Sequence, residues 1–471
     1  MSSHLNIYSI FKLSFAFCLI VALHLTLDYN EGLGLYLPNN VILWMFVSLW
    51  IGLGFWNIYQ TKYIRFSNFN LKLWVGFIFL CLPFIYQKSY VFHLSYLRFL
   101  GIAAILFLFF SLQQIKIKKE DINWFYLIII ISVLLKSIFE LIIIFFPNLF
   151  SNTHLTRYIF NTLNQRNILS TYLIMGSTLG LYLILKQNKT TTTYSYKNYI
   201  IFFTTFLVSI LLILLESRTA LYILPISVAF IFFAQYNLNK NLIIWLFLTL
   251  SGFWVGSSLK KTPELNSNTK IIKRTDKAKQ RSTNARLDIY KISYKIWKDN
   301  PFSGTGYGTF LSSFRNNYAK EKLKNPKLIN LGSANVIHPH NEILFWLMEG
   351  GISPLFGFII ITCSFIIMIW KVKSKKSFIF FGFLLPFVFH SQLEYPFYNS
   401  TVHFILFCFF IFLTDQKYGS HYKFKNPFKI LPGLLSIIIP LISIIYLGTV
   451  LQTGYMITKF EKTGYKNLNL L

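Results

Sequence analysis

Two histidines and two arginines have the types and positions that proton transfer beside an anion would require. His338 and His340 close a long polar segment, Ser257 to Glu342, and an apolar run follows directly. A neutral imidazole is the side chain best suited to accept a proton near pH 7. Arg218 and Arg286 carry planar guanidiniums, which can bind a phosphate group through two hydrogen bonds. The pattern is compatible with a site where an anion binds beside a proton acceptor, although an arginine at the boundary of an apolar run, such as Arg218, is equally typical of a membrane-interface anchor.

The elements that must position these residues are apolar. The chain has 471 residues, of which 54% are hydrophobic and only 13% charged, and its mean hydropathy is +0.52. Apolar runs of about 20 residues, long enough to cross a bilayer, recur along it. Helices are expected, because an open strand cannot satisfy its backbone in lipid. The sequence predicts an all-α polytopic membrane protein with about 12 to 13 spans, among them 343–369 and a short one at 377–390.

Lysine and arginine set the orientation of these spans. With the N-terminus inside, the short inner loops carry 18 Lys and Arg and the short outer loops carry five, as the positive-inside rule expects. We therefore expect an N-terminal transmembrane bundle over 1–256, a large periplasmic loop with the catalytic elements over 257–342, and C-terminal transmembrane helices over 343–471.

The predicted outer loop has an internal organisation. It holds 17 Lys and Arg against six Asp and Glu, which is typical either of a solvated surface or of a surface that gathers lipid phosphates, a lipid-linked diphosphate or an acidic protein. From Asn284 to Asn300 the pattern predicts an amphipathic helix on the membrane surface. Ser303 to Gly308 predicts a glycine-rich turn that packs against another element, rather than a nucleotide site. Nucleic acid is not expected on that side of the membrane.

Cysteine and acidic residues indicate neither disulfides nor a metal. The four cysteines lie in apolar runs, so no disulfide framework is predicted. No Asp-x-Asp pair occurs, which argues against handling phosphates through a divalent cation. We expect no metal and no cofactor.

An ordered set of motifs over about residues 150–415 resembles the O-antigen ligase and polymerase superfamily. The set comprises Ser217-Arg218-Thr219-Ala220, Asn284-Ala285-Arg286 with Trp297, Asn300 through Gly306, and His340-Asn341-Glu342 through Glu349-Gly350-Gly351. Two further segments, Asn164-Gln165-Arg166-Asn167 and His390 through Pro396, are similar to segments of bacterial protein O-oligosaccharyltransferases, the PglL-type and pilin-glycosylating branch.

The resemblance implies a multi-span helical fold of the GT-C type and a metal-independent glycosyltransferase. Such an enzyme takes a glycan from undecaprenyl diphosphate at the outer face of the bacterial inner membrane. Members of the PglL-type branch place the glycan on a Ser or Thr hydroxyl of a periplasmic protein or pilin. The implied partners are this lipid-linked donor, the acceptor protein and membrane lipids.

The resemblance also implies roles for individual residues. His340 matches the essential histidine, expected to act as general base, and Arg218 and Arg286 match arginines that bind the diphosphate. The remaining candidates for substrate binding have less defined roles: Arg281, His338, Gln165, Asn167, His390 and Glu394. Glu394 either orients His340 or an arginine, or is simply paired with a basic residue of the loop.

Three other functions fit part of the sequence. A lipid A-core O-antigen ligase and a chain-extending polymerase use the same donor chemistry, and the turn around Glu394 is the main feature that separates them from the PglL-type branch. A non-catalytic transporter or lipid-binding protein would carry ionisable residues at mid-depth in its spans. Lys136 and Glu140 are the clearest such pair, and they are also expected simply to neutralise one another. Polar groups gather instead at the outer span ends, which favours an enzyme.

Overall fold

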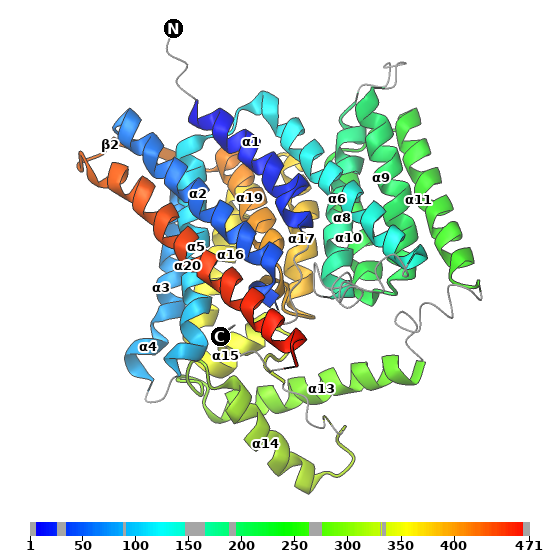
Figure 1. Ribbon diagram of the computed structural model, residues 1–471, viewed down its shortest axis with the longest axis vertical. Coiled ribbons are helices and arrows are strands. Elements are labelled where there is room, and N and C mark those ends of the chain that lie inside the picture. Colours follow the sequence, from blue (N-terminus) through cyan, green and yellow to red (C-terminus); the bar gives the residue numbers. More distant parts are fainter. Residues whose placement is uncertain are drawn as a thin grey trace.

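The protein folds into a bundle of membrane-length helices with a helical layer across one end (Figure 1). The computed structural model describes residues 6–25, 34–87, 91–146, 165–187, 195–262, 276–329, 331 and 336–464. Among these residues, ten helices are long and apolar enough to cross a membrane. The predicted all-α polytopic architecture is therefore confirmed.

The first half of the chain supplies most of the long helices. Its elements are α1 (Ile7–Ile20), η1 (Ala22–His24), η2 (Gly34–Tyr36), α2 (Pro38–Thr61), β1 (Tyr63–Ser67), α3 (Asn68–Cys81), α4 (Pro83–Tyr86), α5 (Phe92–Ile115), η3 (Lys119–Asp121), α6 (Ile122–Phe145), α8 (Arg166–Leu185), α9 (Tyr196–Leu214), α10 (Arg218–Ala234) and α11 (Lys240–Leu259).

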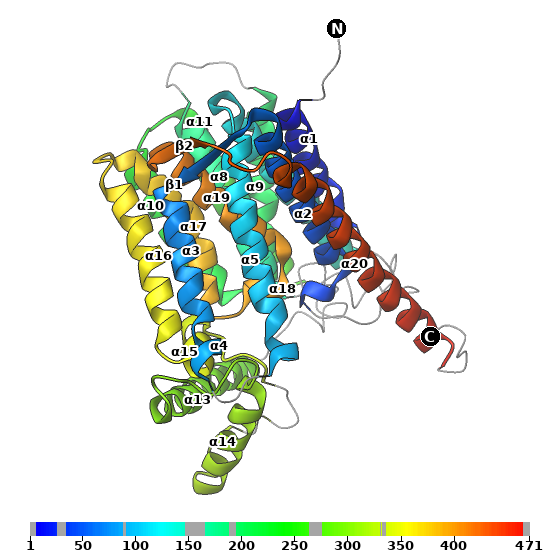
Figure 2. The same cartoon turned by 90° about the vertical axis from the view of Figure 1, so that its left-hand side faces the viewer.

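The second half forms the end layer and then returns to the bundle. Its elements are α13 (Asp276–Asp299), α14 (Phe310–Lys324), α15 (Glu342–Gly350), α16 (Ser353–Trp370), η5 (Lys375–Phe378), α17 (Ile379–Ser391), α18 (Pro396–Asn399), α19 (Thr401–Tyr418), β2 (His421–Lys425) and α20 (Leu431–Lys462). Figure 2 shows α13 and α14 at one end of the bundle and the two strands at the other. We call the first of these the α13 end.

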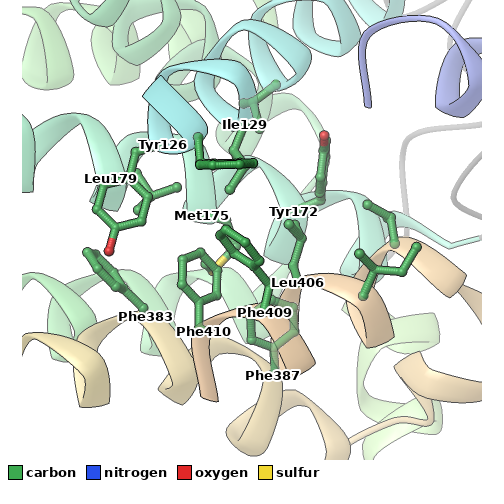
Figure 3. Packing of buried hydrophobic residues seen from close by; sticks show 14 of the residues in the cluster. Tyr126, Ile129, Tyr172, Met175, Leu179, Phe383, Phe387, Leu406, Phe409 and Phe410 are labelled. Carbon is green, nitrogen blue, oxygen red and sulfur yellow. The ribbon is translucent and has the colours of Figure 1, made fainter. Parts of the chain in front are cut away.

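Aromatic side chains fill the centre of the bundle. Tyr126 of α6, Met175 of α8, Phe383 of α17 and Phe410 of α19 meet there, and the Phe383 and Phe410 rings lie 5.3 Å apart (Figure 3). Helix α8 is the most enclosed of the candidate spans. Its Gly176 lets α6 approach closely, since a Cβ there would lie 2.6 Å from Val133. The close packing of α8 with α6 and α17 fixes the positions of the ends of α8 and α17, where site residues lie.

Helix α20 has the opposite environment. It runs obliquely along the outside of the bundle, against α2 (Figures 1 and 2). Its most apolar window is not buried in the protein, so this surface suits contact with lipid.

Three local features differ from expectation. The predicted span 343–369 is divided into α15 and α16, because Gly351 adopts a positive φ of 69° and a Cβ there would lie 2.1 Å from the Phe302 carbonyl oxygen. His340 therefore precedes a short helix, not a span. Helix α13 has 24 residues and begins before Asn284, although it ends at Asp299 as predicted. Strands β1 and β2 pair antiparallel, with Tyr63 opposite Lys425, where the sequence predicts only loops.

Candidate active site

Glu394 lies at the centre of the candidate site and contacts several of its other residues. It follows α17 in a turn closed by the bond from its backbone N–H to the His390 carbonyl, 2.9 Å long. One carboxylate oxygen, Oε2, lies 2.8 Å from Nδ1 of His340. The other, Oε1, pairs with the Arg286 guanidinium and accepts from the Asn167 amide at 3.2 Å. Three segments far apart in the sequence thus meet at one carboxylate.

The charge of Glu394 determines which nitrogen of His340 carries the proton. Burial alone would raise the pKa of this carboxyl, but the hydrogen bond from His340 and the positive charge of Arg286 hold it below its usual value. An ionised carboxylate can only accept hydrogen bonds, so Nδ1 of His340 is the donor. The lone pair of the neutral imidazole is then on Nε2. The His340 side chain is 24% exposed, so an incoming group can reach it.

Arg218 joins the same cluster through α13. It is the first residue of α10, and its guanidinium donates to Thr283 Oγ at 2.7 Å. Thr283 lies one helical turn before Arg286, so Arg218 contacts α13 close to the position of Arg286. Ser217, which caps α10, also donates to the Asn167 side-chain oxygen at 2.9 Å.

The amphipathic pattern of α13 explains why it lies across the bundle end. Ile289, Ile292 and Ile296 recur at helical spacing and pack, buried, against Phe345 and Met348 of α15. Figure 1 shows the resulting crossing beneath the bundle. Arg286 lies one turn before this apolar stripe, so the packing of the helix places its guanidinium next to Glu394.

The chain around His340 is held by hydrogen bonds from both sides. Asn341 caps α15, accepting from the Leu344 N–H at 2.8 Å, and its amide donates to the Gln392 carbonyl at 3.2 Å. Tyr290 of α13 donates to the His340 carbonyl at 3.2 Å. His340 itself has a positive φ of 61°. Such a conformation costs a non-glycine residue about 1–3 kcal/mol and persists only where its surroundings enforce it.

A second arginine–glutamate pair anchors the glycine-rich turn. Arg98 of α5 lies 2.6 Å from Glu349, whose other oxygen accepts from the backbone N–H groups of Gly308 and Phe310 at 3.1 and 2.9 Å. The turn packs against α15 as predicted, and a Cβ at Gly304 would lie 2.4 Å from the Glu349 carbonyl oxygen. Sequence reasoning missed Arg98 as a partner of Glu349. The signal in the sequence was that Arg98 and Glu349 each interrupt an apolar stretch, where a charge needs a partner of opposite sign.

The other candidate residues occupy different surroundings. His338 is buried behind His340, and His390 is buried within α17, where its Nδ1 lies 2.7 Å from Thr171 Oγ. The Gln165 side chain, at the start of α8, hydrogen-bonds to Tyr395, whose ring lies 5.3 Å from that of His340. Arg281 belongs to α13, and its side chain is outside the part of the structure that is described.

Two family models match this chain. One is described as O-Antigen ligase and matches residues 203–360; the other is described as Virulence factor membrane-bound polymerase, C-terminal, and matches residues 378–471. These matches support the O-antigen ligase and polymerase superfamily. They also support an enzyme of the broad glycosyltransferase-like ligase or polymerase type, in a multi-pass membrane protein. No curated protein matches the chain.

The two matched segments meet at the candidate site. His340, Arg218 and Arg286 lie in the segment matched to the ligase family, whereas Glu394 lies in the segment matched to the polymerase family. The contacts of Glu394 with His340 and Arg286 therefore join two parts of the chain that separate superfamily models describe.

Proposed function

We propose that this protein is an O-linked oligosaccharyltransferase. It transfers a glycan from undecaprenyl diphosphate to Ser or Thr hydroxyls of periplasmic proteins or pilin. The single observation that supports this most is the carboxylate of Glu394, which contacts a proton acceptor, His340, and an anion-binding group, Arg286, at the same time. The matches to ligase and polymerase families support a lipid-linked glycan as donor in a general sense.

The proposed reaction needs one base and a stabiliser for a leaving anion. The acceptor hydroxyl oxygen attacks the anomeric carbon, and the bond from that carbon to the diphosphate oxygen breaks. The electron pair leaves with undecaprenyl diphosphate, and the hydroxyl proton passes to Nε2 of His340. Attack from the face opposite the leaving group inverts the anomeric centre.

Two arginines support the departure of the diphosphate. Negative charge grows on the leaving oxygen, and guanidiniums that are already oriented stabilise it without reorganising during the step. Arg286 belongs to α13 and Arg218 contacts that helix one turn earlier, at Thr283, which suits two contacts to neighbouring phosphates. We propose that Arg281, Gln165 and Asn167 contact the bound substrate, and that His390 supports the site from within the bundle.

Glu394 has an orienting role in this proposal. Its carboxylate fixes the tautomer of His340 and favours the imidazolium that forms when the proton arrives. It also holds Arg286 in place until the donor binds.

We place the protein in the bacterial inner membrane, with this site on the periplasmic face. The excess of Lys and Arg in the opposite short loops supports that orientation. The basic composition of the segment around α13 suits a surface that meets anionic lipid headgroups and a lipid diphosphate.

A second candidate is a lipid A-core O-antigen ligase or an O-antigen polymerase. The descriptions of the two matching family models favour it. The donor, the base and the arginines keep the same roles, and only the acceptor changes, from a protein hydroxyl to a sugar hydroxyl.

Mass spectrometry of pilin and periplasmic proteins distinguishes the candidates. Cells with the chain, cells without it and cells with His340→Ala are compared, together with their lipopolysaccharide profiles. We expect glycopeptides only with the unaltered chain. Loss of lipopolysaccharide banding with unchanged glycopeptides would instead assign the ligase or polymerase function, and unchanged glycans of both kinds would refute glycosyl transfer.

A further inference from the structure

His338 faces away from the open side of the site. Its side chain is 4% exposed, and its ring is packed among three aromatic rings, with centroid distances of 4.5 Å to Phe345, 5.0 Å to Tyr395 and 5.4 Å to Tyr398. His340, by contrast, is 24% exposed, and the Tyr395 ring lies close to both imidazoles, 5.0 Å from His338 and 5.3 Å from His340. The burial of His338 therefore suits an action on the protein itself.

The contact that His338 makes with the site is a hydrogen bond to the backbone of His340. The His340 N–H donates to Nδ1 of His338 over 3.0 Å. A backbone amide can only donate, so Nδ1 of His338 carries no proton and the proton of the neutral ring is on Nε2. Nε2 lies 3.4 Å from the Glu342 carboxylate, which favours that tautomer.

Glu342 is itself held in place. Its Oε1 accepts from the Trp346 indole at 2.7 Å and from the Tyr398 hydroxyl at 2.9 Å. The carboxylate, the ring of His338 and the amide of His340 thus form a continuous series of contacts. The bond from the His340 amide is a hydrogen bond, whereas Glu342 and the His338 ring are in contact at 3.4 Å without one.

His340 needs this support because of its backbone. Its positive φ is unfavourable for any residue with a Cβ, so other contacts must maintain it. The amide is bound by His338 and the carbonyl by Tyr290. In this conformation Nδ1 of the imidazole lies 2.8 Å from Glu394.

We propose that His338 is a positioning residue that holds the backbone of His340 in its left-handed conformation and so aims the His340 imidazole at Glu394 and the acceptor. This rests on the proposed function, in which His340 takes the proton. His338 acts through another residue and does not touch the reacting atoms.

Two substitutions at one position test the proposal. The side-chain oxygen in His338→Asn can take the place of Nδ1, whereas the longer side chain in His338→Gln carries its polar atoms near the place of Nε2. We expect His338→Asn to keep transfer within about threefold of the unaltered chain. We expect His338→Gln to lower kcat on the order of 10- to 100-fold, the scale of a misplaced catalytic group. The KM for the lipid-linked donor should change little, because Arg218 and Arg286 are untouched.

The assay is transfer by the purified full-length chain from an undecaprenyl-diphosphate-linked oligosaccharide to the acceptor identified by mass spectrometry. Thermal unfolding of both variants accompanies it, so that a folding defect is recognised. Equal loss in His338→Asn and His338→Gln, full activity of His338→Gln, or a rise in KM alone would overturn the positioning role. His340→Ala separates the two proposals: if it remains active, the proposed function fails, whereas if only His338→Gln remains active, the positioning role alone fails.

Discussion

Two arginine–glutamate pairs lie toward the α13 end of the molecule, and their surroundings differ. Arg98 is 8% exposed, and its guanidinium lies 4.5 Å from the Trp346 ring centroid and 4.6 Å from that of Phe345. Its partner Glu349 also binds two backbone amides. Arg286 is 23% exposed, and its partner Glu394 is shared with His340 and Asn167.

The comparison teaches how the same two side-chain types serve different ends. The Arg98–Glu349 pair is enclosed by aromatic rings and by the glycine-rich turn, so neither charge is free to turn to a ligand, and the pair holds the turn against α15. The Arg286–Glu394 pair is partly exposed and adjoins an imidazole, which suits the role proposed for this arginine, binding of the donor phosphate. Exposure and shared partners, more than the presence of a salt bridge, indicate a ligand site.

The largest effect is expected at the open pair. His340→Ala removes the proposed base, so transfer should fall by about 10²- to 10⁴-fold while the chain still accumulates in the membrane. Glycan transfer in isolated membranes measures this. His421→Ala, on β2 at the opposite end of the bundle, is the matched control and should be unaffected. Normal transfer by His340→Ala would show that His340 is not the base, and the Arg286–Glu394 pair would then no longer differ from the Arg98–Glu349 pair by adjoining a catalytic group.

The closed pair should respond in stability. Glu349→Ala leaves the Arg98 charge buried without its partner, which we expect to cost about 3–5 kcal/mol in the free energy of unfolding. Glu394→Ala also removes the partner of an arginine, but Arg286 is partly exposed to solvent. We therefore expect a much smaller loss in the free energy of unfolding, together with a loss of transfer. Thermal unfolding and transfer rates of the two variants check this directly. Similar losses of stability in both would show that the two pairs are equivalent.

A smaller effect is expected from replacing guanidinium by ammonium. Arg218→Lys and Arg286→Lys keep the positive charge but lose the planar, two-pronged geometry, so transfer should fall about 10- to 100-fold, the scale of one hydrogen bond to a charged group. Steady-state transfer is measured at several donor concentrations. Lys298→Ala, an exposed cation on the same helix, is the control. Full activity of both arginine variants would leave them as membrane-interface anchors.

The smallest effect concerns pH. The pKa of Glu394 is lowered despite its burial, by the hydrogen bond from His340 and the charge of Arg286, so its carboxylate stabilises the fold above the unfolded-state pKa and loses that contribution as the pH falls through the lower folded-state pKa. The difference in Tm between the unaltered chain and Glu394→Gln should be constant above about pH 5 and shrink at lower pH. A difference that grows with acid would contradict this sign.

Much of the site could be named from the sequence because its groups interrupt apolar runs. His340, Arg218 and Glu394 are charged or polar residues next to predicted span ends, whereas Arg286 begins the predicted surface helix. The glycine-rich turn was expected to pack against another element. The division of the predicted span 343–369 could not be foreseen, because a Gly-Gly pair is compatible with a continuous helix in a bilayer. Helix α15 ends here because Gly351 adopts a positive φ of 69°, and only glycine fits because the Phe302 carbonyl lies where a Cβ would be.

By itself, the sequence determined the membrane class, the helical fold and the residue types available for chemistry, since burial in lipid leaves only a few solutions for backbone and charge. Only the tertiary structure decided which charges pair. Arg98 pairs with Glu349, Arg286 pairs with Glu394, and the buried His338 accepts a hydrogen bond from the His340 amide. These partners are between two and 251 residues apart in sequence. Local patterns do not specify such pairings, because packing of α13 and α15 across the bundle end brings the partners together.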